Sequence, residues 1–248
     1  MKIGIIGVGH IGKTLARELS GAGHDVKVAN SRGPETIDPE VLATGARAVT
    51  AQEAVADVEA IILSVPMNRI PGLAPLIATV PEQTVVIDTS NYFPGRDDRI
   101  EAIEAGQVES LWVVEQLGRP IAKAWNAIGS DSLARNGRPA GIDGRIALPI
   151  AADRVRDREV AMKLVEDTGL SAVDAGGLAE SWRQQPGAPA YCTDLSQDEV
   201  ADALAAADKA RLPVRRDLLV AVLIDRMGDP KSNPDADYSL RLARILFR

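Results

Sequence analysis

The stretch Lys2-Ile-Gly-Ile-Ile-Gly7-Val-Gly9-His-Ile-Gly12 decides the fold of this chain. Residues 2–6 are mostly β-branched and predict a short strand that ends at Gly7. Apolar residues then recur at helical spacing over residues 10–22, which predicts an amphipathic helix. The three glycines therefore stand between a strand and the N-terminus of a helix. In that position, G-x-G-x-x-G is typical of a turn that binds the pyrophosphate of a dinucleotide.

Each glycine of this turn has its own physical role. Gly7 permits the tight turn, Gly9 leaves room for a phosphate beside the backbone, and Gly12 lets the helix pack closely on the strand. Free amide groups at the positive end of the helix dipole attract the phosphates. An ordinary strand–turn–helix that happens to contain three glycines is the alternative. We predict that the pyrophosphate contacts are Gly7, Val8, Gly9, His10, Ile11 and Gly12.

The residues after the second predicted strand, 25–29, indicate which dinucleotide binds. A site for NAD usually carries Asp or Glu here, about 20 residues beyond the glycines, to bind the ribose hydroxyl. This chain instead reads Asn30-Ser31-Arg32, without a carboxylate. Arg32 can pair with a 2′-phosphate and Ser31 adds a hydroxyl donor, so we predict NADP(H). The alternative is that Arg32 is a solvated arginine in a turn.

Later segments extend the strand–helix alternation. The apolar runs at 60–65 and 84–87 are typical of parallel strands covered on both faces, and they end in Ser64-Val65-Pro66 and Asp88-Thr89-Ser90-Asn91. We predict an α/β fold, a Rossmann-type doubly wound parallel sheet with a smaller, mainly helical C-terminal portion. The NADP(H)-binding domain is expected over residues 1–140. The portion over 141–248 is expected to extend the sheet to about residue 177 and then to form helices.

Two helix boundaries can be predicted in the C-terminal portion. Ser196-Gln-Asp-Glu199 is a capping-box pattern that indicates the start of a helix. A further helix over 214–227 is expected to stop at Gly228 and Pro230.

Composition excludes several functional classes. The chain has 28 Lys and Arg against 35 Asp and Glu, a formal net charge of −7, which argues against nucleic acid or anionic membranes as partners. One cysteine, Cys192, and two histidines argue against a disulfide framework and against a metal site. No charged leader precedes the first strand, and no apolar run approaches the ~20 residues of a membrane span. We expect a cytoplasmic protein.

Two further segments could surround the reacting end of the cofactor. In 123–128, Asn126 could orient a carboxamide or a substrate carbonyl, whereas Lys123 is expected to be a surface charge at a strand end. The segment 179–194 is expected to face the substrate, with Trp182 and Tyr191 forming walls for a ring; the alternative is an interdomain or dimer-contact loop. The remaining predicted cofactor contacts are Ser64, Val65, Pro66, Ser90, Asn91, Ala124, Asn126 and Ile128.

Four segments carry a resemblance to a known family: residues 1–35, LSVP at 63–66, IDTSNY at 87–92 and KAWNAI at 123–128. They resemble the NADPH-dependent reductases of the deazaflavin coenzyme F-420 and their dinucleotide-binding relatives. The resemblance implies that the glycine turn holds the pyrophosphate, that Ser31 and Arg32 hold the 2′-phosphate, and that residues 123–128 lie beside the nicotinamide. Those reductases often have histidine where this chain has Asn126. The resemblance is clear over about residues 1–130 and weak after residue 179.

We therefore expect an NADP-dependent oxidoreductase that transfers a hydride between NADPH and a deazaflavin, a flavin or a similar planar acceptor, acting as a homodimer on a small-molecule co-substrate. Such transfer needs positioning more than acid–base groups. A β-hydroxyacid-dehydrogenase-like enzyme is an alternative, although no G-x-x-G and K-x-x-x-N pattern follows residue 130. A non-catalytic NADP(H) sensor is another.

Overall fold

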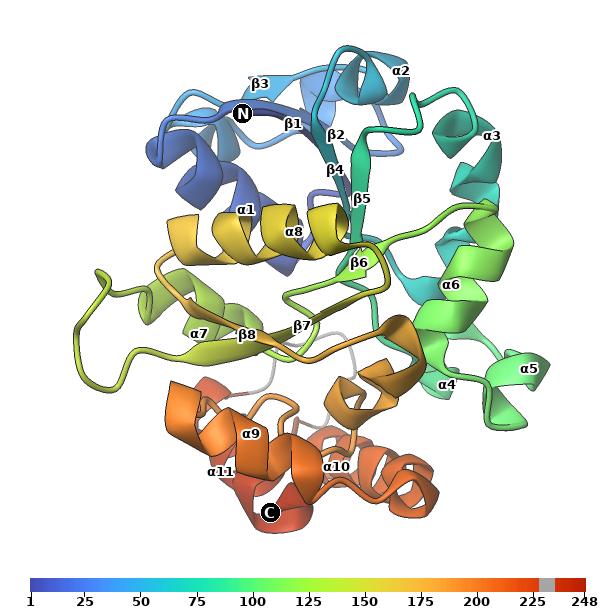
Figure 1. Cartoon of the computed structure of the whole chain (residues 1–248), viewed down its shortest axis with the longest axis vertical. Helices are drawn as coiled ribbons and strands as arrows, with labels where there is room; N and C mark the ends of the chain where they lie inside the picture. Colours follow the sequence, from blue (N-terminus) through green and yellow to red (C-terminus); the bar gives the residue numbers. More distant parts are fainter. Residues whose placement is uncertain (228–234) are drawn as a thin grey trace.

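A computed structural model describes residues 1–227 and 235–248, and its centre is one eight-stranded sheet (Figure 1). The strand order is β3-β2-β1-β4-β5-β6-β7-β8. The strands are β1 (Lys2–Ile6), β2 (Asp25–Ala29), β3 (Arg47–Ala48), β4 (Ala60–Leu63), β5 (Val85–Asp88), β6 (Ala122–Lys123), β7 (Ala147–Ala152) and β8 (Ser171–Asp174). The order from β3 to β6 is that of a dinucleotide-binding sheet, which confirms the predicted fold class.

Helices cover both faces of the sheet because its strands carry apolar side chains on both sides. Ile3 and Ile5 of β1 pack toward one core, and Ile6 packs toward the other. The first core is covered by α1 (His10–Gly21), α7 (Ser130–Arg135) and α8 (Val155–Asp167). The second is covered by α2 (Ala51–Val55), α3 (Ala74–Ile77) and α6 (Glu109–Leu117). The short helices α4 (Pro94–Asp97) and α5 (Glu101–Glu104) follow β5.

The chain after β6 extends the same sheet, as expected. β7 pairs with β6 in antiparallel orientation and β8 then pairs with β7 in parallel. Every other neighbouring pair is parallel, so β1, β2, β4, β5 and β6 all have their carboxyl ends at one edge. Ligands of such sheets bind at that edge.

Three helices complete the chain beyond a 3₁₀ segment, Leu178–Gln184: α9 (Gln197–Ala205), α10 (Leu212–Met227) and α11 (Ala236–Phe247). They lie below β7 and β8 in Figure 1. The capping box predicted at the start of α9 is present, with the Ser196 and Glu199 side chains each bonded to the other's backbone. The predicted stop of α10 at Gly228 and Pro230 lies outside the described residues.

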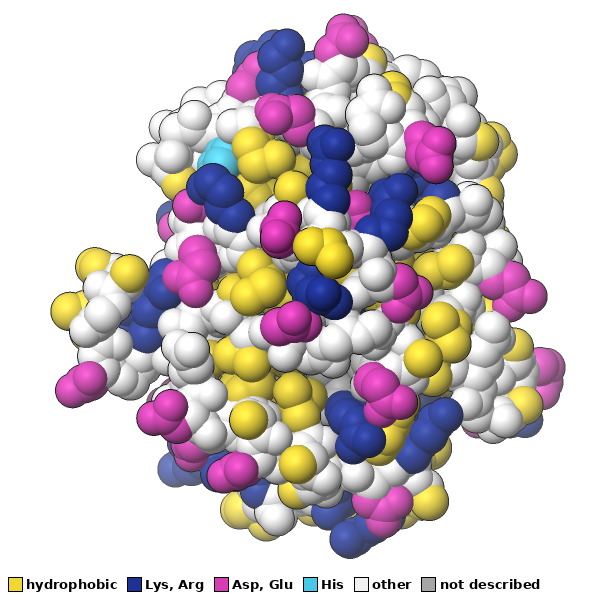
Figure 2. All heavy atoms as spheres, in the orientation of Figure 1, with side chains coloured by type: hydrophobic (Ala, Val, Ile, Leu, Met, Phe, Trp, Pro, Cys, Tyr) yellow, Lys and Arg dark blue, Asp and Glu magenta, His cyan; other side chains and the backbone are white. Residues whose placement is uncertain are grey.

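Two observations concern nucleic acid and membranes, the partners that the composition argues against. Figure 2 shows acidic and basic side chains interspersed over the face that it draws. Within residues 1–227 and 235–248, no helix has the length and apolarity that crossing a membrane requires.

Candidate cofactor site and adjoining pocket

The three glycines of the first turn have three different surroundings. Gly7 has a φ of 103°, and a Cβ there would lie 2.1 Å from the Ser64 carbonyl oxygen. A Cβ on Gly12 would lie 2.0 Å from the Gly7 carbonyl oxygen. A Cβ on Gly9 would meet no protein atom within 4 Å. The fold therefore requires Gly7 and Gly12, whereas the space beside Gly9 is open to a ligand.

The N-terminus of α1 faces this turn with its amide groups uncapped by side chains. Gly9 is the N-cap residue and makes no side-chain hydrogen bond, and the first turn of the helix contains no acidic residue. The amides of the first turn and the positive end of the helix dipole together suit an anion. The pyrophosphate of a dinucleotide fits this arrangement.

The turn after β2 is formed by its own side chains. Asn30 Oδ1 accepts a hydrogen bond from the Arg32 amide at 2.9 Å, and Asn30 Nδ2 donates to Thr36 Oγ1 at 2.8 Å. Thr36 Oγ1 in turn donates to the Gly33 carbonyl oxygen at 2.8 Å. These bonds leave the side chains of Ser31 and Arg32 exposed at the strand end. A 2′-phosphate could reach both without rearrangement of the turn.

A polar hollow of about 230 Å³ lies beside this turn. The charged side chains that line it are Lys13, Arg17, Arg32, Asp38 and Glu40. Arg17 and Glu40 approach to 3.7 Å, and both are exposed, so this pair contributes little to stability. Lys13 and Arg17 were not predicted here, because they reach the hollow from the outer side of α1 rather than from the strand end.

The structure brings the predicted residues Asn91 and Asn126 together at the ends of β5 and β6. Asn91 Nδ2 donates to the Asn126 carbonyl oxygen at 2.9 Å, and Asn126 Nδ2 donates to Asn91 Oδ1 at 3.1 Å. Gln184 adds two bonds: its Nε2 donates to Asn126 Oδ1, and its carbonyl oxygen accepts from Asn126 Nδ2, both at 2.8 Å. Asn126 is 1% exposed. Its amide is thus occupied in orienting Asn91, and its predicted contact with the substrate stays a prediction.

Gln184 was missed by the sequence reasoning. It is fully buried, and its Nε2 also donates to the Pro149 carbonyl oxygen at 3.1 Å. It lies 58 residues from Asn126 along the chain, so no local pattern relates the two. Among the other predicted contacts, Ser64 and Val65 are partly exposed, Pro66 is exposed, and Ser90, Ala124 and Ile128 are buried.

The expectation that Lys123 is a surface charge was wrong. Lys123 is fully buried, and its Nζ donates to Asp88 Oδ2 at 2.6 Å and to the Ser90 carbonyl oxygen at 2.5 Å. The 3₁₀ segment Leu178–Gln184 and helix α8 pack against β6, which removes its end from solvent. Nearby, burial raises the pKa of Glu109 to about 7. The attraction to Lys123 has the opposite effect on this pKa and is the weaker of the two. This buried group of charges holds the ends of β5 and β6 together.

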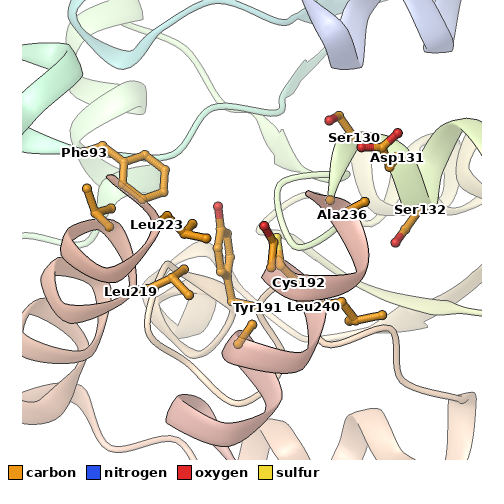
Figure 3. A pocket seen from close by; sticks show the side chains of 14 residues that line it. Phe93, Ser130, Asp131, Ser132, Tyr191, Cys192, Leu219, Leu223, Ala236 and Leu240 are labelled. Atoms are coloured by element: carbon orange, nitrogen blue, oxygen red, sulfur yellow. The ribbon is translucent and has the colours of Figure 1, made fainter. Parts of the chain in front are cut away.

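An apolar pocket of about 290 Å³ opens beyond these strand ends (Figure 3). Tyr191 lines it together with Cys192, while Trp182 does not. Trp182 instead stacks beneath the guanidinium of Arg183, 4.3 Å from the ring centroid. The structure thus brings one of the two predicted aromatic walls to the pocket. It also adds residues from α10 and α11 that the sequence did not indicate.

The loop that lines this pocket has strained backbone. Cys192 and Asp194 have φ values of 52° and 49°, in the left-handed region, where Asp57, Asp98 and Trp125 also lie. Each such residue costs about 1–3 kcal/mol and persists only where its surroundings hold it. The Cys192 amide donates to the Ala127 carbonyl oxygen at 2.9 Å, which helps to hold the turn. Burial raises the pKa of the Cys192 thiol to about 12, so it stays protonated and is a poor nucleophile.

The strand order and the glycine turn define a Rossmann-type α/β protein. Residues 2–92 match the family described as NADP oxidoreductase, coenzyme F420-dependent, which confirms the resemblance found in the sequence. This part of the chain is similar to a family of NADP oxidoreductases.

Individual proteins are similar to part or most of this chain. The protein YjhV of Escherichia coli K12 is 44% identical over 82 residues, which are 32% of this chain and 60% of YjhV. The match therefore spans less than two thirds of that relative. The hypothetical protein SMa0349 of Sinorhizobium meliloti has a similar structure, with 28% identity, a TM-score of 0.67, and coverage of 80% of this chain and 96% of its own.

A candidate F420-dependent NADP-reductase from Arthrobacter sp. FB24 shares the fold at 18% identity and a TM-score of 0.56. That alignment covers 90% of this chain and 94% of the Arthrobacter protein. At this level of identity the likeness concerns the fold.

Proposed function

We propose that this protein is an NADP(H)-dependent oxidoreductase that transfers a hydride between NADPH and a planar acceptor, such as a deazaflavin or a flavin. The observation that carries the proposal is the open space beside Gly9 at the uncapped N-terminus of α1. Gly7 and Gly12 are needed by the fold, whereas the missing side chain at Gly9 leaves room for a phosphate beside the amides at the start of α1. The family match of residues 2–92 supports NADP(H) as that ligand.

The chain's own residues would bind and orient the two reactants. The amides at the start of α1 hold the pyrophosphate, and Ser31 with Arg32 holds the 2′-phosphate. Bound NADPH supplies the hydride. Asn91, fixed by Asn126, borders the position of the nicotinamide, and the buried Lys123–Asp88 pair keeps the two strand ends in register. Positioning of this kind can provide much of the rate without a dedicated acid or base.

The domain boundary and the assembly belong to the same proposal. Residues 1–140 form the NADP(H)-binding domain, and residues 141–248 complete the sheet and supply the acceptor and dimer contacts. A homodimer is supported by exposed apolar side chains on α10, among them Val214 at 71% and Leu218 at 47% exposure.

The test measures binding and hydride transfer separately. Calorimetric titration with NADPH should show binding to the wild type. Stopped-flow absorbance should then show NADPH oxidation with coenzyme F-420, FMN or riboflavin. Binding without oxidation by any planar acceptor would favour the sensor alternative. Absence of NADPH binding would reject the cofactor assignment itself.

A further inference from the structure

The apolar pocket has walls that suit a flat ring. It lies between α10 and α11 and is bounded above by the loop that enters α7 (Figure 3). The ring of Tyr191 stands beside Leu219 and Leu223 of α10, and Leu240 of α11 lies on the other side. Phe93 closes the end of the pocket nearest to β5. Its volume of about 290 Å³ is just below the range for ligand sites, ~300–1,000 Å³, and so limits the ligand to a small one.

The pocket is lined or contacted by residues that follow β5 and β6 closely in the chain. Phe93 follows Asn91 by two residues. Ala127 follows Asn126 by one, and its carbonyl oxygen accepts the Cys192 amide at 2.9 Å. Ala127 also packs in one apolar cluster with Tyr191. A ring in the pocket therefore lies next to the position proposed for the nicotinamide.

The charged group among the described residues that line the pocket is a carboxylate, and the cations nearby, Arg96, Arg135 and Arg244, do not line it. Of the described residues that line it, Asp131 is the one charged side chain, and its partner is Arg135 at 3.2 Å. A second carboxylate, Asp194, lies behind the wall and accepts a hydrogen bond from Ser132 Oγ at 2.6 Å. Among the described lining residues, a phosphate in this space would meet the Asp131 carboxylate and no lining cation.

Hydroxyl groups supply the polar contacts instead. Ser130 lines the pocket on the α7 side, and Tyr191 lines it at the centre. Burial raises the pKa of Tyr191 well above its usual value of 10, so its hydroxyl remains a neutral hydrogen-bond donor. Neutral hydroxyls suit the carbonyl oxygens of an uncharged ring.

We propose that this pocket binds a small, uncharged quinone-type ring and that this compound is the hydride acceptor. The acceptor assignment rests on the proposed function, whereas the binding site does not. NADPH, quinone and one proton give NADP⁺ and hydroquinone. The hydride carries two electrons and one hydrogen to the ring, and water supplies the second proton.

The experiment uses menadione as the probe and begins without NADPH. Titration should show saturable binding to the wild type by calorimetry. Leu240→Trp and Leu223→Trp fill the pocket and should each weaken menadione binding on the order of tenfold or more. The matched control is Ile245→Trp, on the same helix as Leu240 but 77% exposed, which should leave the affinity unchanged. Thermal unfolding of each variant checks that it is folded.

A second arm compares riboflavin with FMN, which has the same ring and one added phosphate. Riboflavin should bind more tightly than FMN, and tighter FMN binding would overturn the argument from charge. Menadione affinity unchanged in both folded tryptophan variants would overturn the site. The protein could bind NADPH and bind menadione in this pocket, yet fail to oxidise NADPH with it. That result would overturn the acceptor role and leave the binding site standing. Failure to bind NADPH would instead count against the proposed function.

Discussion

At the scale of single residues, Gly9 and Gly12 are expected to respond differently to the same substitution. Gly9 has an extended backbone with φ −75°, and its Cβ direction is open. Gly9→Val should therefore abolish NADPH binding and leave stability nearly unchanged. Gly12→Val places a side chain against the Gly7 carbonyl oxygen. This overpacking should lower the free energy of unfolding by about 1–3 kcal/mol. Urea denaturation and calorimetric titration of both variants measure the contrast; an NADPH affinity of wild-type strength in Gly9→Val would remove this turn from the site.

Arg32 is expected to decide between NADPH and NADH. It lies exposed on a turn that Asn30 and Thr36 hold without help from a ligand. Arg32→Ala should remove most of the preference for NADPH, about 1–3 kcal/mol for a charge-assisted contact. The measurement is the ratio of the two dissociation constants in wild type and variant. Equal affinities for the two cofactors in the wild type would contradict the assignment of the 2′-phosphate site.

At the scale of elements, α6 buries an acid in its first turn. Glu109 is 3% exposed, and its Oε2 accepts a hydrogen bond from the Tyr92 amide at 3.2 Å. Burial raises the pKa of this carboxyl from 4.5 to about 7 in the folded chain. Between these two pH values the folded state binds the proton and the unfolded state does not. The contribution to stability is therefore present below pH 4.5 and is lost as the pH rises to about 7.

Glu109→Gln removes this ionisation and keeps an oxygen that can accept the Tyr92 amide. The free energy of unfolding of the wild type should fall, relative to that of Glu109→Gln, by about 3 kcal/mol between pH 4.5 and pH 8. Urea unfolding of both proteins across this range provides the measurement. Parallel pH profiles for the two proteins would show that Glu109 does not titrate in this range.

At the scale of the whole molecule, α10 presents apolar side chains to solvent. Val214 and Leu218, 71% and 47% exposed, lie one turn apart on the same side of the helix, and Ile224, 44% exposed, lies further around it. If this side is the dimer contact, Leu218→Glu should convert the protein to a monomer, because a buried carboxylate without a partner is costly. Size-exclusion chromatography with light scattering measures the mass. Asp202→Ala, at an exposed position on α9, is the control and should keep the wild-type mass. A monomeric wild type would contradict the dimer.

The sequence by itself determined the individual strands and the turn at the first helix. These features depend on contacts between residues close in the chain: β-branched runs, helical periodicity, and glycines required by a φ of 103° at Gly7. The resemblance to NADP oxidoreductases rests on the same local segments and is confirmed over residues 2–92. The capping box at Ser196 was predicted because a cap involves residues three positions apart.

Only the tertiary structure decided the surroundings of the strand ends. Lys123 was expected at the surface, and it is buried because the C-terminal portion covers β6 and Asp88 supplies a partner charge. Gln184 meets Asn126 across 58 residues, and the pocket collects residues from Phe93 to α11. Burial, pKa shifts and the separation of Trp182 from Tyr191 all depend on which distant segments pack together. Local patterns carry no information about which distant segments meet, because these contacts follow from the packing of the whole core.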